Sequence, residues 1–365
     1  MKRLGTIISV AVFAAVGAAS GMLLTECQQR LSVHVPYAVL LLGFAAVFYV
    51  GIILHTVIHE AGHLVGGLLT GYRFVSFRVG SVIWTKNGDK LKRGRLKIAG
   101  TGGQCLMAPP RLVNGKMPVA LYNLGGILMG LIASGVFAAL CLAFENVPLL
   151  WTALAIFAVM GVALALINAI PLKDGYNDGS NLVYLRKNPD AAYALWLQLA
   201  VNAYNSMGTR LRDMPAVWFE KHDNEDLDNN LMSTVAVMRV NRFMDGMKLE
   251  EARAEAERIL KDGRLVATYK HLLQLELVYI GLVKGDMENV DRLYTPELKK
   301  FMRAMKAFPS VPRTEYVYAL LYEKNPQHMA EKKAAFEKAA AKYPYQHEME
   351  SERELIEYAE KIAYN

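Results

Sequence analysis

Two histidines and a glutamate stand at a spacing typical of zinc hydrolases. In the segment His59-Glu60-Ala61-Gly62-His63 the imidazoles are four residues apart, so on a helix they share one face. Two such imidazoles can bind one zinc ion through bonds of about 2.0–2.1 Å, and the neighbouring carboxylate can take a proton from water. His59 and His63 are therefore candidate metal ligands, and Glu60 is the candidate general base.

A third ligand is expected elsewhere in the chain, because zinc hydrolases usually use three protein ligands. The segment from Asn168 to Gly179 follows the last long apolar stretch, and Pro171 would end that helix and let the chain turn back. It offers two carboxylates, Asp174 and Asp178, each followed by glycine. Aspartate before glycine is also common in turns, so one of the two is expected to be only a turn or cap residue.

Four apolar stretches are long enough to cross a bilayer, which takes about 20 residues: 4–24, 37–69, 118–144 and 149–172. The second contains the histidine–glutamate motif. Ionisable groups in a membrane helix are costly and usually serve a function. The first stretch exceeds the core of about 7–15 residues of a signal peptide, so a retained anchor is preferred over a cleaved signal.

Positive charge is concentrated in the apolar half of the chain. Residues 1–178 hold 14 Lys and Arg against 6 Asp and Glu, and ten of these cations lie in the loop at 70–117, whose only acid is Asp89. The positive-inside rule predicts that this loop is cytoplasmic and that the chain from Lys173 onward returns to the same side. We therefore expect a multi-pass protein of the cell membrane, with its metal site toward the cytoplasm.

The loop at 70–117 is predicted to be rich in β-structure. Two strand-like segments, 72–84 and 90–98, flank an Asn87-Gly88-Asp89 turn that is typical of a β-hairpin. An exposed edge of this element could hold an extended substrate peptide by β-augmentation. The glycine-rich segment 100–105 is expected to form a flexible loop.

The remaining residues, 186–365, predict a soluble, cytoplasmic all-α domain. Apolar and charged residues alternate at helical spacing in nine segments: 190–205, 229–245, 248–261, 266–284, 287–294, 297–308, 313–323, 328–342 and 348–364. The segment Leu249-Glu250-Glu251-Ala252 resembles tetratricopeptide-like repeats, although an ordinary helical bundle is the alternative. The near-neutral charge and polar helix faces of this domain argue against nucleic-acid binding. A binding surface and a stabilising cap are the two roles considered.

Taken together, the motif segments resemble the site-2 protease family of intramembrane zinc metalloproteases. The resemblance covers about residues 37–185 and is carried by His59–His63 in a second span, by Asn168-x-x-Pro171, and by a later Asp-Gly. It implies that the aspartate of the Asp-Gly is the third zinc ligand.

The choice of that aspartate is set by a departure from the family pattern. Neither Asp174 nor Asp178 has the family's usual spacing from the asparagine, but the sequence at 175–179 is similar to a longer bacterial variant, so Asp178 is preferred. The resemblance also implies substrate or oxyanion contacts for Asn168 and, at the start of the third span, for Asn123.

The sequence thus predicts an α-helical polytopic membrane protein with a small β-hairpin element (1–185) and a C-terminal repeat-like helical domain. The resemblance implies a zinc endopeptidase with one Zn²⁺ per chain that cuts membrane-spanning or membrane-inserted peptides near the cytoplasmic face. Its expected partners are the lipid bilayer, a membrane-embedded peptide or protein substrate, and a protein that binds the helical domain. The alternatives are a non-catalytic scaffold that binds peptides through the helical domain, and a small transporter.

Overall fold

The computed structural model describes residues 2–87, 90–96, 101–113, 116–171, 177–221, 225–263, 265–343 and 345–364. The chain divides into two compact units. The first comprises Met1–Val79 and Gly102–Ala192, and the second comprises Gly80–Thr101 and Tyr193–Asn365.

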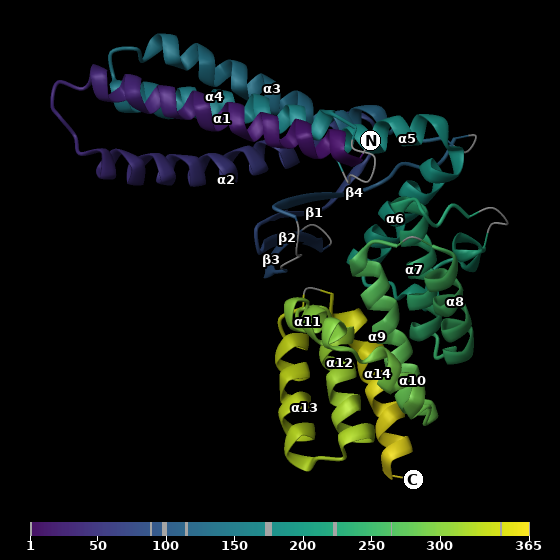
Figure 1. Cartoon of the computed structure of the whole chain (residues 1–365). Coiled ribbons are helices and arrows are strands. Elements are labelled where there is room, and N and C mark those ends of the chain that lie inside the picture. The colour runs from purple at the N-terminus through teal and green to yellow at the C-terminus, as the bar shows by residue number, and fades with distance from the viewer. Residues whose placement is uncertain are drawn as a thin grey trace. The chain divides into compact units, whose positions relative to one another are not determined.

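Four helices of the described residues are long and apolar enough to cross a membrane. They are α1 (Lys2–Arg30), α2 (Tyr37–Leu69), α3 (Ala120–Ala143) and α4 (Pro148–Ala169). Their positions agree with the four predicted stretches. In Figure 1 they run alongside one another, with α2 packed on α3 and α4, and α1 on α4.

Glycines let α2 and α3 approach each other closely. A Cβ atom at Gly62 would lie 2.2 Å from the carbonyl oxygen of Gly125, and one at Gly66 would lie 2.3 Å from that of Leu121. Neither position can hold a larger residue unless the helices separate, which is how small residues set the contact between membrane helices. The contact fixes the motif-bearing turn of α2 against the first turns of α3.

A small antiparallel sheet follows α2. Its strands are β1 (Arg73–Val79), β2 (Val82–Asn87), β3 (Lys90–Arg95) and β4 (Gly103–Ala108), in the order β3-β2-β1-β4. β4 pairs with β1, with Phe77 opposite Cys105, and β2 pairs with β3.

The sheet differs from the sequence prediction in two places. The predicted strand at 72–84 is interrupted after β1, because Gly80 adopts a positive φ of 58° and the chain turns there. The loop predicted for 100–105 is wrong from Gly103 onward. Pairing with β1, which lies far earlier in the chain, turns that part into a strand.

The second unit is built mainly from helices. Most of α6 (Pro189–Ser206) belongs to it, and α7 to α14 follow: Asn230–Asp245, Leu249–Asp262, Ala267–Lys284, Met287–Leu293, Pro296–Ala304, Ser310–Tyr318, Pro326–Ala340 and Gln346–Tyr364. A π-helical turn, Ala319–Glu323, extends α12, and two short 3₁₀ turns (Leu211–Asp213 and Ala216–Phe219) precede α7. The helices lie close to the nine predicted segments.

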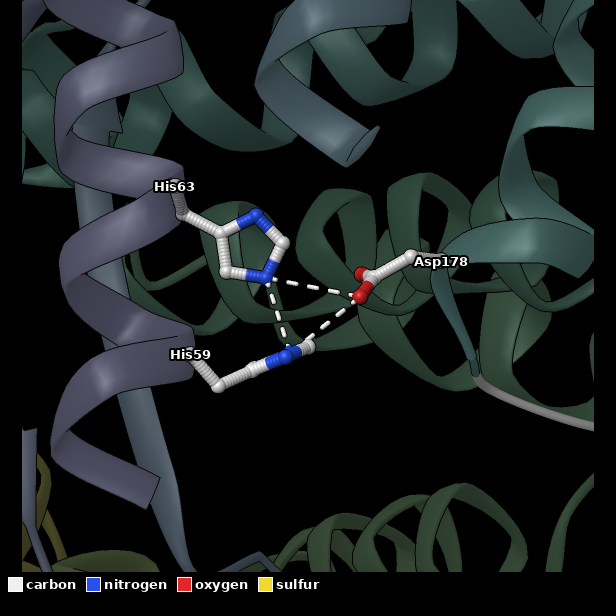
Figure 2. A group of neighbouring side chains, drawn as sticks. All are labelled: His59, His63 and Asp178. Carbon is white, nitrogen blue, oxygen red and sulfur yellow. Dashed lines mark hydrogen bonds and ion pairs between the residues drawn. The ribbon is translucent and has the colours of Figure 1, made fainter. Parts of the chain in front are cut away.

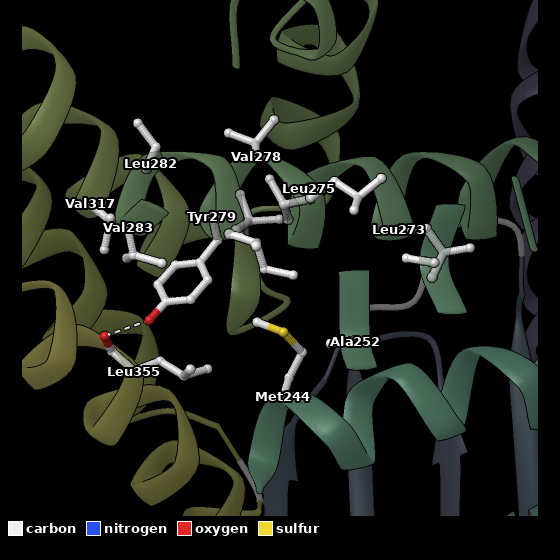
Figure 3. Packing of buried hydrophobic residues seen from close by; sticks show 14 of the residues in the cluster. Met244, Ala252, Leu273, Leu275, Val278, Tyr279, Leu282, Val283, Val317 and Leu355 are labelled. Atoms are coloured by element: carbon white, nitrogen blue, oxygen red, sulfur yellow. Dashed lines mark hydrogen bonds between the residues drawn. The ribbon is translucent and has the colours of Figure 1, made fainter. Parts of the chain in front are cut away.

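Helix α9 forms the centre of the core of this unit. Its apolar residues pack against side chains from α7, α8, α12 and α14 (Figure 3). The fully buried Tyr279 hydroxyl donates a hydrogen bond to the carbonyl oxygen of Leu355 at 2.8 Å, which satisfies a polar group that would otherwise be costly to bury.

Candidate metal centre

Three of the predicted site residues meet in the first unit. His59 and His63 project from successive turns of α2, and Asp178 reaches them from the start of α5 (Asp178–Lys187) (Figure 2). The two Nε2 atoms are 3.1 Å apart. The Oδ2 atom of Asp178 lies 3.2 Å from Nε2 of His59 and 3.5 Å from Nε2 of His63.

These distances fit one tetrahedral zinc ion. Bonds of about 2.0–2.1 Å at tetrahedral angles separate neighbouring ligand atoms by about 3.3–3.4 Å. The three measured separations, 3.1, 3.2 and 3.5 Å, bracket that value. The side chains are 11–21% exposed, so a fourth ligand can approach from one side.

The three ligand atoms of the cluster face one another at close range. The Nδ1–H of His63 donates to the carbonyl oxygen of Tyr122 at 2.8 Å, which leaves Nε2 as the lone-pair nitrogen of the neutral ring. Oδ2 of Asp178 is buried and, among the described residues, faces the two imidazole nitrogens. Electron-pair donors therefore converge on one point, an arrangement that a metal ion satisfies.

The charge state of Asp178 suits a metal ligand. Burial raises the pKa of this carboxyl, but hydrogen bonds and positive charge from the two neighbouring imidazoles lower it by more, to about 2, and a metal cation bound by neutral imidazoles would act in the same direction. The group is therefore ionised at neutral pH, as a carboxylate ligand must be.

Asn177 and Gly179 position Asp178. The Asn177 side chain caps α5 by accepting a hydrogen bond from the backbone N–H of Ser180 at 2.9 Å. Its amide nitrogen donates to two carbonyl oxygens at the end of α4, those of Ile167 and Ile170, both at 2.7 Å. At Gly179 a Cβ atom would lie 2.1 Å from the Ala169 carbonyl oxygen, so only glycine lets α5 begin this close to α4.

Tyr122 links two sides of the site. Its carbonyl oxygen orients His63, while its hydroxyl donates to the carbonyl oxygen of Cys105 in β4 at 3.1 Å. Its ring also stacks on Tyr72, with centroids 4.8 Å apart. This one residue therefore holds both a candidate ligand and the strand beside the candidate base.

Glu60 is buried on α2 against the start of β4. A Cβ atom at Gly103 would lie 2.7 Å from Oε1 of Glu60, so glycine at this position leaves room for the carboxylate. Gly126 in α3 does the same for His59, because a Cβ atom there would lie 2.5 Å from Cε1 of the imidazole. Both side chains thus occupy space that glycine residues provide.

The other predicted residues are placed differently. Asp174, the alternative ligand, lies outside the described residues. The amides of Asn123 and Asn168 each donate to a carbonyl four residues earlier in their own helix, Val119 at 2.7 Å and Leu164 at 2.9 Å. In this arrangement they serve their helices, and a contact with substrate stays a prediction.

His55 lies one turn before the cluster and bonds elsewhere. Its Nε2–H donates to the carbonyl oxygen of Phe157 in α4 at 2.8 Å, and its ring packs edge-on against Phe137 of α3. These contacts give His55 a structural role between the helices.

Several residues of the site carried little signal in the sequence. Asn177 could have been found, because asparagine is one of the preferred residues at a helix N-cap. Tyr122 acts on His63 through its backbone carbonyl, which every residue has, so its identity gave no indication. Gly103 and Gly126 are recognisable only once the neighbouring helices are in place.

No family model, no curated protein and no solved structure matches this chain. The function is therefore argued from the geometry of the site and from the motif residues themselves.

Proposed function

We propose that this chain is a membrane-embedded zinc endopeptidase. The observation that carries the proposal is the convergence of His59, His63 and Asp178 at separations that fit one tetrahedral ion, directly beside Glu60. The donor set, two imidazoles and one carboxylate, is one that catalytic zinc sites use. Its two imidazoles lie on α2, which is long and apolar enough to cross a membrane.

Each residue of the site would have a separate role in peptide-bond hydrolysis. His59, His63 and Asp178 would hold the zinc, which when bound polarises a carbonyl group and lowers the pKa of water. Glu60 would accept a proton from the attacking water and later donate it to the departing amine, as general acid–base catalysis of amide hydrolysis requires. The carbonyl of Tyr122 keeps His63 in the tautomer whose Nε2 faces the site.

We further propose that the substrate is an extended segment of a membrane-spanning or membrane-inserted peptide. Helical amides are already hydrogen-bonded internally, so a helical substrate must unwind before hydrolysis. β4 is at an edge of the sheet and begins against Glu60, which supports pairing of an extended peptide with this strand. On the charge pattern, cleavage would take place near the cytoplasmic face, with the helical unit also cytoplasmic.

A variant pair tests the activity. The purified protein and its Glu60→Gln variant are reconstituted in lipid nanodiscs with a library of single-span peptides, and the products are identified by mass spectrometry. The proposal expects zinc in both proteins and cleavage only by the first. Full cleavage by Glu60→Gln would refute the assigned base. Bound zinc with no cleavage by either protein would favour the non-catalytic scaffold.

A further inference from the structure

Arg78 is a buried cation in the same compact unit as the candidate metal centre. It lies on β1 and is only 1% exposed. Burying a cation is costly unless hydrogen bonds and negative charge offset the loss of water. The roles of the metal ligands and of Glu60 do not by themselves require a cation here, so its burial needs a reason of its own.

The guanidinium group of Arg78 holds the first residue of β4. Its Nη2–H donates a hydrogen bond to the carbonyl oxygen of Gly103 at 3.2 Å. In the strand ladder, Arg78 is paired with Gln104, the next residue of β4. The side chain therefore fastens the beginning of β4 to β1 in addition to the backbone pairing of the two strands.

Glu60 lies against the same residue from the side of α2. A Cβ atom at Gly103 would be 2.7 Å from both Cγ and Oε1 of Glu60. The backbone N–H of Cys105, two residues further along β4, donates to the same carboxylate. A shift at the start of this strand would therefore move the groups that surround the candidate base.

The charges of Arg78 and Glu60 also attract each other. Burial lowers the pKa of Arg78, and the negative charge of Glu60 acts in the opposite direction, so Glu60 helps to keep the guanidinium group protonated. Because attraction between two charges is mutual, the guanidinium group draws the carboxylate toward it as well. A glutamate side chain has several rotatable bonds, and this attraction favours the conformation that places its carboxylate against β4.

We propose that Arg78 is a positioning residue for the hydrolysis, which keeps the carboxylate of Glu60 and the first residues of β4 in a fixed relation to each other. The inference rests on the proposed function, since Glu60 is the base of that reaction. General-base catalysis depends on exact placement, and a displacement of about 1 Å can lower a rate about 100-fold. Arg78 exerts this effect through Glu60 and Gly103, without contact with the substrate.

Kinetics of three variants in lipid nanodiscs test the proposal with a peptide that the unaltered protein cleaves. Arg78→Met removes the charge at similar length, so kcat should fall about 10–100-fold while KM changes less than about twofold and zinc is retained. Arg78→Lys keeps the charge and should recover part of that loss. Arg73→Met removes an exposed cation from the same strand and should leave kcat unchanged. An unchanged kcat in Arg78→Met, or loss of its zinc, would overturn the proposal.

Chemical rescue separates positioning from a general loss of structure. Arg78→Ala leaves a space where the guanidinium group was, and free guanidinium ion added at millimolar concentration should raise kcat about tenfold. Urea has a similar shape but no charge, and it should have no such effect. Equal effects of guanidinium and urea would overturn the proposal.

A double-mutant cycle tests the link between Arg78 and Glu60 without any measurement of activity. Midpoints of thermal unfolding in detergent are compared for the unaltered chain, Arg78→Met, Glu60→Gln and the double variant. Each single change leaves one buried charge without its counterpart, so the double variant should lose less than the sum of the two single shifts. Additive shifts would overturn the proposal even if the chain cleaves peptides. Non-additive shifts in a chain that cleaves no peptide would refute the proposed function but not the coupling of the two residues.

Discussion

Replacing Gly126 with alanine should remove the metal from the site without adding or deleting a ligand. Gly126 lies in α3 against the imidazole of His59, where an added Cβ atom would be 2.5 Å from Cε1. Ordinary van der Waals contact begins at about 3.4 Å, so the ring or the helix must move by about 0.9 Å.

This displacement is large on the scale of metal coordination. Ligand distances in metal sites are held to within about 0.2 Å, and the three ligand atoms here already stand at the separations of a tetrahedron. Loss of orientation at one ligand typically lowers metal affinity about 10–100-fold. We expect a loss of at least that size for Gly126→Ala.

The assay is competition for zinc against a chelator of known affinity, with the protein in detergent micelles. Gly135→Ala is the matched control, because it makes the same change in the same helix at a position where the added Cβ atom meets nothing within 4 Å. Equal zinc affinity in the two variants would refute the placement of His59 against α3, and with it the geometry of the site.

Other predictions concern residues that orient the metal site or stabilise the packing of the helices. Tyr122→Phe removes the hydroxyl bond to Cys105 while keeping the backbone acceptor of His63, so kcat/KM should fall about two- to tenfold with zinc retained, as measured by peptide cleavage and metal analysis. Loss of zinc in this variant would contradict the conclusion that the backbone carbonyl of Tyr122, and not its hydroxyl, orients His63. Gly62→Ala should lower the free energy of unfolding, measured by thermal denaturation, by about 1–3 kcal/mol, because the added methyl group would clash with α3. Gly43→Ala, at an open position of the same helix, should leave it unchanged. Arg313→Met leaves two carboxylates without their cation in a nearly dry environment and should cost about 3–5 kcal/mol in urea unfolding of the helical unit. A cost below 1 kcal/mol would mean that this ion pair is solvated in solution.

Local sequence patterns were sufficient to predict those parts of the structure whose geometry is determined by a regular helix. His59 and His63 meet because four residues make about one helical turn, which the spacing alone predicts. The four apolar stretches became four long helices for a similarly local reason, since their length and composition suit no other element. The helices of the second unit also follow their own apolar periodicity.

Features that depend on distant parts of the chain were not predictable in this way. Gly103 looked like part of a flexible loop, because nothing in its neighbourhood reveals that β1 pairs with that segment. Two similar Asp-Gly pairs offered no local ground for choosing between Asp174 and Asp178, and the preference for Asp178 rested on the family resemblance alone. Asp178 reaches the imidazoles because Asn177 ties the start of α5 to the end of α4, a tertiary contact that local spacing does not encode.

The most direct test of the metal centre is the zinc content of three purified proteins: the unaltered chain, Asp178→Ala and Asp174→Ala. Elemental analysis should find about one zinc ion per chain in the unaltered protein and in Asp174→Ala, and a large loss in Asp178→Ala. X-ray absorption at the zinc edge should show nitrogen and oxygen ligands at about 2.0–2.1 Å. Zinc retained in Asp178→Ala but lost in Asp174→Ala, or no zinc in the unaltered protein, would contradict the account.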